Sequence, residues 1–221
     1  MAESGMVVNI TNGEMMNQYF NRVRGGLNFA FNEMMMHGRA VMEIGSAEFV
    51  ALRAEDLGVA ASLYHEKMQV LDWLFRHSKD GVKLALWFGK DSFCQLNLLT
   101  LLAYLEQIQW EGEIRLNIAD DVTYEVISGD IPVLLGAYSA LYRDVVVLHK
   151  STPAVGVIDK RALDLFFDYL SPHGALATLI RSHPDDSEDE LICKLMEVSL
   201  DYGISDVQAA YLIEKYGKNE K

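Results

Sequence analysis

Short apolar runs alternate with longer stretches of helical periodicity over the first part of the chain. Strands are expected where the apolar positions are continuous or recur at every second residue, at 6–10, 27–31, 82–88 and 113–119. The intervening segments have helical periodicity. Because strands that alternate with helices form parallel sheets, the predicted fold class is α/β, with an open, mostly parallel, Rossmann-like sheet of about four strands flanked by helices.

The pattern becomes helical after the last predicted strand. Asp130 is expected to cap a helix that has Pro132 in its first turn, and residues 148–156, LHKSTPAVG, have the composition of a linker. The segments beyond this linker predict a small helical bundle. We therefore expect two domains, a Rossmann-like α/β domain over residues 1–150 and a helical C-terminal domain over 151–221.

Several predicted helices begin with residues that are typical of N-terminal caps. Ser46 precedes a helix, while Ser187 and Ser205 begin S-x-x-E and S-x-x-Q capping-box patterns. Thr11 and Ser92 begin similar patterns, which end at Glu14 and Gln95. These patterns predict five helix starts, two of which directly follow a predicted strand.

The charge balance limits the classes of partner. The 221 residues include 32 acidic and 19 basic side chains, a formal net charge of −13, which repels nucleic acids and anionic membranes. The last two predicted helices have the outline of a helix-turn-helix, but the second lacks arginine, so nucleic-acid binding is not expected.

Nothing in the apolar runs predicts a membrane span, because each falls short of the about 20 residues that a span requires. The first residues, MAESGM, carry an acid where a signal peptide carries basic residues. Cys94 and Cys193 are far apart and are interpreted as reduced thiols of the core. We expect a soluble cytoplasmic protein.

Polar residues follow the predicted strands, and they provide the candidate ligand-binding site. In an open parallel sheet, ligands bind beyond the carboxyl ends of the strands. Gly13 would allow close approach of a ligand to the backbone, and the helix starts at Glu14 and Ser92 would offer amide donors. The candidate ligand-binding residues are Asn12, Gly13, Glu33, Asp91 and Gln95.

Each of these residues also has a structural interpretation. Ser92 and Gln95 fit a capping box, which would leave Asp91 just outside the helix, and Glu33 fits a solvated loop acid. Asp120 and Asp121 could bind a divalent cation, although paired acids after a strand are commonly ordinary loop residues, so no metal site is predicted. No glycine-rich nucleotide motif, phosphate-binding loop or nucleophile elbow is present, so the sequence identifies neither a reaction nor a cofactor.

Three segments resemble a bacterial family known as domain of unknown function 1835. They are VVNITNGE, LNFAFNEMMMHG and LALWFGKDSFCQLNLLTLLAYL, and the resemblance covers roughly residues 6–147. The family carries no known activity, but its motif positions coincide with the predicted strand ends. The sequence departs from the family pattern at Glu14, at His37–Arg39 and at Gly89–Lys90, where relatives carry Asp, an acid followed by Gly-Pro, and an acid followed by His. The resemblance therefore carries over no chemistry from those acids.

Two functions follow as expectations. The first is binding of a small polar ligand, of which a nucleotide is one example, at the carboxyl ends of the parallel strands. The alternative is a non-catalytic regulatory or interaction protein, in which the C-terminal helices dock a protein partner and the sheet acts as a scaffold.

Overall fold

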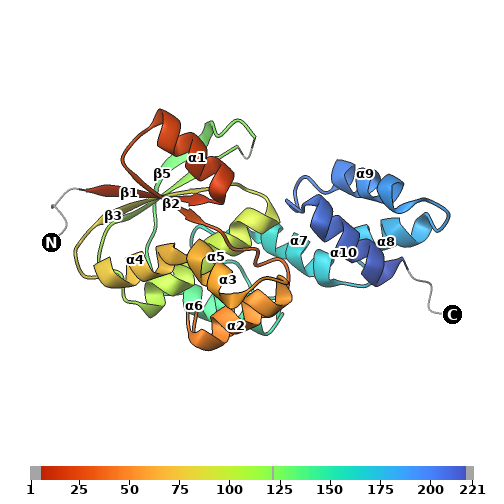
Figure 1. Ribbon diagram of the computed structural model, residues 1–221, viewed down its shortest axis with the longest axis horizontal. Helices are drawn as coiled ribbons and strands as arrows, with labels where there is room; N and C mark the ends of the chain where they lie inside the picture. The colour runs from red at the N-terminus through yellow and green to blue at the C-terminus, as the bar shows by residue number, and fades with distance from the viewer. Residues whose placement is uncertain (1–5, 121, 218–221) are drawn as a thin grey trace.

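The computed structural model of the protein describes residues 6–120 and 122–217. Its centre is a five-stranded sheet with strand order β2-β1-β3-β4-β5 (Figure 1). The first four strands are mutually parallel and β5 is antiparallel to β4. The strands are β1 (Val7–Asn12), β2 (Leu27–Phe31), β3 (Lys83–Phe88), β4 (Ile114–Ala119) and β5 (Val126–Pro132). The α/β prediction is confirmed, with one strand more than expected.

The additional strand corrects the prediction of a helix that starts at Asp130. Asp130 and Pro132 lie in β5, and the next helix begins only at α6 (Tyr138–Tyr142), which continues as a π-helical turn, η1 (Arg143–Val147). Asp followed closely by Pro is typical of a helix start, but proline is also tolerated on an edge strand, where its missing amide breaks no ladder. Most of β5 is exposed, so the strand has no apolar periodicity to reveal it.

Helices cover the two faces of the sheet unequally. Among the helices of the described residues, α1 (Glu14–Val23) alone covers one face, where Met16 and Phe20 pack against Trp87 of β3. The other face carries the main core, in which leucines of β3 and of α5 (Ser92–Gln107) pack together. The helices α2 (Ala47–Asp56), α3 (Ala61–Lys67), α4 (Gln69–His77) and α6 lie on this second side (Figure 1).

Polar side chains of α5 hold a long irregular connection between β2 and α2 against the core. The Oδ1 atom of Asn97 accepts a hydrogen bond from the Met35 amide at 3.1 Å. The side-chain amide of Gln107 both accepts from and donates to the backbone of Ile44 at 3.0 Å. These bonds satisfy buried backbone groups that have no secondary-structure partner.

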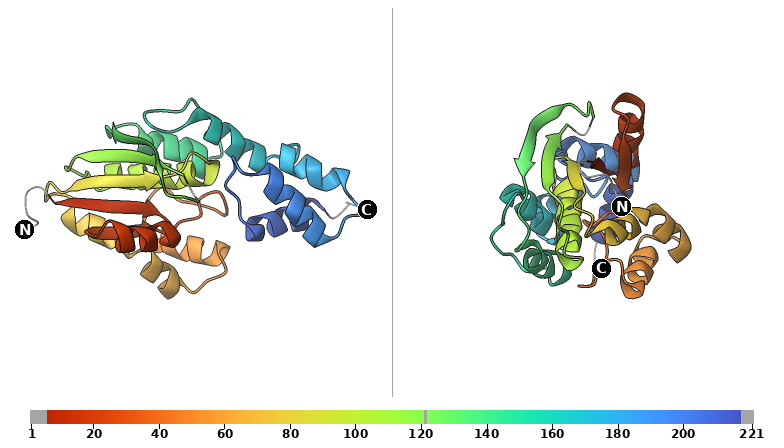
Figure 2. Two further views of the ribbon diagram at one scale, coloured as in Figure 1. Left: turned by 90° about the horizontal axis from the view of Figure 1, so that it is seen from above. Right: turned by 90° about the vertical axis from the view of Figure 1, so that its left-hand side faces the viewer.

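The C-terminal helices lie beyond the carboxyl edge of the sheet (Figure 2). They are α7 (Lys160–Leu170), α8 (Ala175–Ser182), α9 (Glu188–Val198) and α10 (Asp206–Tyr216). Helix α7 lies alongside α5, whereas α8, α9 and α10 form a bundle at the end of the molecule (Figure 1). Cys193 lies exposed on α9, so the interpretation of both cysteines as core thiols is correct for Cys94 alone. Over the described ranges, no helix combines the length and apolarity needed to cross a membrane.

Three of the five predicted caps are confirmed. The Ser46 hydroxyl accepts from the Phe49 amide, and Ser187 and Ser205 form complete capping boxes with Glu190 and Gln208. The predictions for Thr11 and Ser92 are wrong: the N-cap of α1 is Gly13 and that of α5 is Asp91. The Thr11 hydroxyl instead donates to the carbonyl oxygen of Phe29 at 3.3 Å.

Candidate functional site

The strand order creates a topological switch point between β1 and β3. From β1 the chain passes to β2 on one side and then returns to β3 on the other side of β1. The connections after β1 and β3 therefore leave the sheet on opposite faces, through α1 and α5. In open α/β sheets the crevice between two such connections is the usual place for a ligand.

A cavity of about 330 Å³ lies at this switch point, and we call it the switch-point cavity. Its walls come from the β1–α1 connection, the β3–α5 connection, the loop before β5 and the turn between α9 and α10. The lining residues are Asn12, Gly13, Glu14, Met15, Met16, Asp91, Phe93, Cys94, Tyr124, Leu200 and Gly203. Three of the five candidate residues, Asn12, Gly13 and Asp91, thus share one cavity.

Asn12 and Gly13 form the wall on the β1 side. The Asn12 side chain donates to Sγ of Cys94 at 2.8 Å and accepts from Nδ2 of Asn97 at 2.9 Å. These two bonds join the carboxyl end of β1 to the first part of α5. Gly13 has φ 86°, a conformation that disfavours any residue with a side chain, and a Cβ atom there would meet no atom within 4 Å. The start of α1 has no side-chain cap, and the first turn of this helix lines the cavity through Glu14, Met15 and Met16.

Asp91 forms the wall on the β3 side and also caps α5. Its Oδ1 atom accepts a hydrogen bond from the Cys94 amide at 2.8 Å. A single acceptor bond leaves the carboxylate with capacity for further donors, because an ionised carboxylate has about four lone-pair sites. Asp91 therefore combines the structural role with a position in the cavity wall.

The first amides of α5 already donate to carbonyl oxygens of the protein itself. The expectation that the start of α5 offers amide donors to a ligand is therefore wrong. The amides of Ser92 and Phe93 donate to the carbonyl oxygens of Asp201 and Tyr202, each at 3.0 Å. These acceptors belong to residues 199–203, which we call the C-terminal turn. A side chain at Gly203 would overlap the Asp91 carboxylate, so glycine is required where the turn meets the rim.

Two side-chain contacts anchor the C-terminal turn to α7. The Tyr202 hydroxyl donates to Oδ2 of Asp168 at 2.6 Å, and burial together with this carboxylate raises the pKa of the tyrosine. Arg161 forms an ion pair with Asp201. The C-terminal turn is therefore held by contacts with two helices, α7 and α5.

Gln95, in the first turn of α5, and Glu33, just after β2, serve internal contacts instead of lining the cavity. Gln95 is buried, and its side chain donates to the carbonyl oxygen of Gly89 at 2.8 Å and accepts from the Asp159 amide at 3.1 Å. It therefore joins the rim to the start of α7, behind the switch-point cavity.

The Glu33 carboxylate points into the core, where it pairs with Arg53 at 2.8 Å. Both side chains are 0 % exposed, and Tyr64 donates to the second carboxylate oxygen. Burial lowers the pKa of Arg53, but the attraction of Glu33 outweighs it and the net pKa is raised. Burial and the Glu33 charge also raise the pKa of Tyr64. This ion pair holds the connection after β2 and is not in contact with the cavity.

A second cavity of about 320 Å³ adjoins the first across Asp91. Lys90, Asp120 and the Arg161–Asp201 ion pair contribute to its lining. Asp120 is engaged in its own turn, where it accepts from the amides of Val122 and Thr123, and Asp121 lies outside the described residues. Across residues 6–120 and 122–217, no group of three or more His, Cys, Asp or Glu side chains is arranged to hold a metal ion.

Sequence reasoning missed part of the cavity wall. Tyr124, Leu200 and Gly203 reach it from loops, and no periodic pattern marks a loop residue as part of a distant site. Cys94 was predicted to be buried, and it is, but it also lines the cavity beside Asn12. Comparisons with family models, curated proteins and solved structures find no match to this chain. The fold and the site define an α/β protein with a cavity at the switch point of its sheet.

Proposed function

We propose that this protein binds a small polar ligand in the switch-point cavity. The observation that carries the proposal is the cavity of about 330 Å³ at the switch point, with Asn12, Gly13 and Asp91 in its wall. Ligand sites of α/β proteins are concave, few in number and concentrated at switch points.

The lining favours a ligand that offers hydrogen-bond donors. Glu14 and Asp91 supply carboxylates, Asn12 supplies an amide, and Phe93 and Tyr124 supply aromatic surface. Among the described lining residues there is no lysine, arginine or histidine. Hydroxyl groups or an amine on a partly apolar ligand match this set, as in a nucleoside, a sugar or an organic cation.

A nucleotide remains compatible with one part of the cavity. Its phosphate would lie at the start of α1, where Gly13 admits close approach and the helix dipole favours an anion. The start of α5 does not serve in this way, because the C-terminal turn already accepts from its amides. Phosphate recognition therefore depends on α1 alone.

The resemblance to domain of unknown function 1835 supports the same location. Two of its three segments, VVNITNGE and LALWFGKDSFCQLNLLTLLAYL, supply the two main walls of the cavity. We propose membership of that family and, from the acidic composition and the reduced thiols expected of the cysteines, a cytoplasmic location. The proposal concerns binding and assigns no reaction.

The test is a thermal-shift screen of nucleosides, nucleotides, sugars, amines and divalent metals, followed by two variants of Asp91. Asp91→Ala removes the α5 cap and is expected to cost about 1 kcal/mol of stability, whereas Asp91→Asn keeps a good cap and removes the charge. We expect at least one ligand that stabilises the wild type, and Asp91→Asn to lose most of that shift with little change in the unliganded Tm.

Ser187→Ala is the matched control, since it removes the cap of α9 far from the cavity. It should lower the Tm as Asp91→Ala does and retain the full ligand shift. A blank screen, or an Asp91→Asn variant that responds to the ligand like the wild type, contradicts the proposal.

A further inference from the structure

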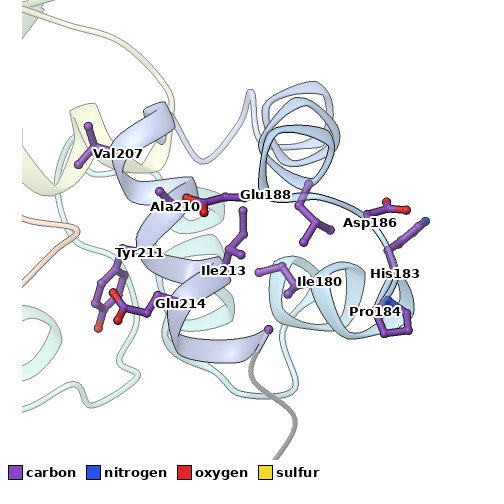
Figure 3. Close-up of a pocket in the computed structure, with 12 residues that line it drawn as sticks. Ile180, His183, Pro184, Asp186, Glu188, Val207, Ala210, Tyr211, Ile213 and Glu214 are labelled. Carbon is purple, nitrogen blue, oxygen red and sulfur yellow. The ribbon is translucent and has the colours of Figure 1, made fainter.

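The C-terminal bundle carries an apolar groove that is separate from the switch-point cavity. The groove measures about 680 Å³ and lies between α8, α9 and α10 (Figure 3). Ile180, Leu191, Ala210 and Ile213 form much of its lining. We call it the C-terminal groove.

Apolar surface continues from the groove onto the outside of α10. Val207 lines the groove with 68 % of its surface exposed, and Tyr211, one turn further along the same helix, is 39 % exposed. A single exposed valine is ordinary on a protein surface. A valine and a tyrosine that border an apolar groove instead form a continuous patch, which is typical of a surface that another molecule covers.

The border of the groove is acidic. Asp186, Glu188 and Glu214 line it, and residues 185–190 have the sequence DDSEDE. Part of this charge serves the bundle: Lys194 pairs with Asp186, and the acids stabilise the start of α9 through its dipole. Glu188 at the start of α9 borders the groove in Figure 3, and Glu214 also lines it, beside Tyr211 of α10. The one basic residue among its described lining residues is His183.

We propose that the C-terminal groove docks a basic amphipathic helix of a partner protein. Apolar side chains of that helix would enter between α8, α9 and α10, and its lysine or arginine side chains would face the acidic border at Asp186 and Glu188. Grooves between helices commonly bind the apolar face of a further helix, and complementary charge around an apolar centre gives specificity and a faster association. This interaction is independent of ligand binding at the sheet.

Charge also argues against two other occupants. A nucleic acid would be repelled by the carboxylates at the border. A second copy of the chain would bring a formal net charge of −13 towards the same acidic border, and like charges that face each other oppose association.

The test is a titration of the full chain with fluorescently labelled 14-residue peptides, followed by anisotropy. The probe is an amphipathic helix of leucine and lysine, and its matched controls are a leucine–glutamate helix of the same pattern and a leucine–lysine peptide of scrambled order. We expect saturable binding of the leucine–lysine helix and at least about tenfold weaker binding of both controls, which corresponds to about 1.4 kcal/mol of binding free energy.

Paired variants locate the binding site. Val207→Lys and Val198→Lys both add a lysine to an exposed valine of the bundle, but only Val207 lines the groove. Likewise, Glu188→Lys reverses a charge at the border, whereas Glu197→Lys reverses an exposed charge on α9 that does not line the groove. The groove variants should weaken binding about tenfold or more and the controls by less than about twofold.

Four outcomes overturn the proposal. They are no saturable binding of the leucine–lysine helix, equal binding of either control peptide, equal losses in groove and control variants, and a wild-type dimer that Val207→Lys converts to a monomer. The last outcome would assign the groove to a second copy of the chain. None of them bears on the switch-point cavity, so the two proposals fail separately.

Discussion

At the scale of single residues, the sequence predicts which residues follow the strands, but it does not predict where their side chains point. Asn12, Gly13 and Asp91 follow strands and reach the cavity as predicted. Glu33 also follows a strand, yet its side chain turns into the core to meet Arg53. A buried acid requires a partner, but no pattern in the sequence indicates which arginine supplies it.

The Glu33–Arg53 pair should be costly to break. Glu33→Gln or Arg53→Met leaves the other charge buried without compensation, and each should lower the free energy of unfolding by about 3–5 kcal/mol. The double variant Glu33→Gln/Arg53→Met should lower the free energy of unfolding by clearly less than the sum of the two single losses, because it removes both charges. Urea denaturation measures all three.

An exposed ion pair provides the control for that cycle. Lys160→Ala breaks the Lys160–Asp164 ion pair on α7. Both side chains of this pair are largely exposed, so the variant should leave the midpoint of urea denaturation nearly unchanged. Strictly additive losses in the Glu33 and Arg53 variants would show that the two side chains are not coupled.

At the scale of elements, local signals succeed where the contacts are local. The caps at Ser46, Ser187 and Ser205 depend on residues within one turn, and the sequence predicts them. Strand β5 and the start of α5 depend on distant partners: β5 is defined by its pairing with β4, and the first amides of α5 are satisfied by the C-terminal turn. The periodicity of apolar residues does not predict such long-range contacts.

Two histidines near α10, His37 and His149, are predicted to make stability depend on pH. The His37 ring contacts that of Tyr211 on α10, with centroids 4.5 Å apart. Burial, followed by the charge of Arg53, lowers the pKa of His37 below 6.5 even though Asp56 opposes the shift. Burial and then Lys215 of α10 lower the pKa of His149.

The sign of the pH effect follows from these directions. As pH falls through about 6.5, the unfolded chain takes up protons on both histidines before the folded protein does, so the free energy of unfolding decreases. The stabilisation is fully present above that pH. Urea denaturation at about pH 7.5 and about pH 5.5 should show the decrease, and His37→Gln/His149→Gln should reduce it. An unchanged pH dependence in that double variant would assign the effect to other groups.

At the scale of the whole molecule, alternation of strands and helices was enough to predict the mostly parallel sheet and the helical C-terminal region. It could not predict how the two are joined. Ser92 donates to the carbonyl oxygen of Ala162, Gln95 accepts from Asp159, and the C-terminal turn covers the start of α5. The helices assigned to a second domain therefore complete the rim of the first.

The most direct test of the account compares Gly13→Ala with Gly58→Ala. Both glycines have positive φ, 86° and 64°, and open space around the added methyl group. Gly58→Ala should lose about 1–2 kcal/mol of stability. Gly13→Ala should lose about 1–3 kcal/mol, because the ψ of 166° at Gly13 places it in a region almost confined to glycine. Only Gly13 lines the switch-point cavity. In titration calorimetry with a ligand from the screen, Gly58→Ala should bind like the wild type and Gly13→Ala at least about tenfold more weakly. Equal affinities in the two variants would place the ligand elsewhere and contradict the account.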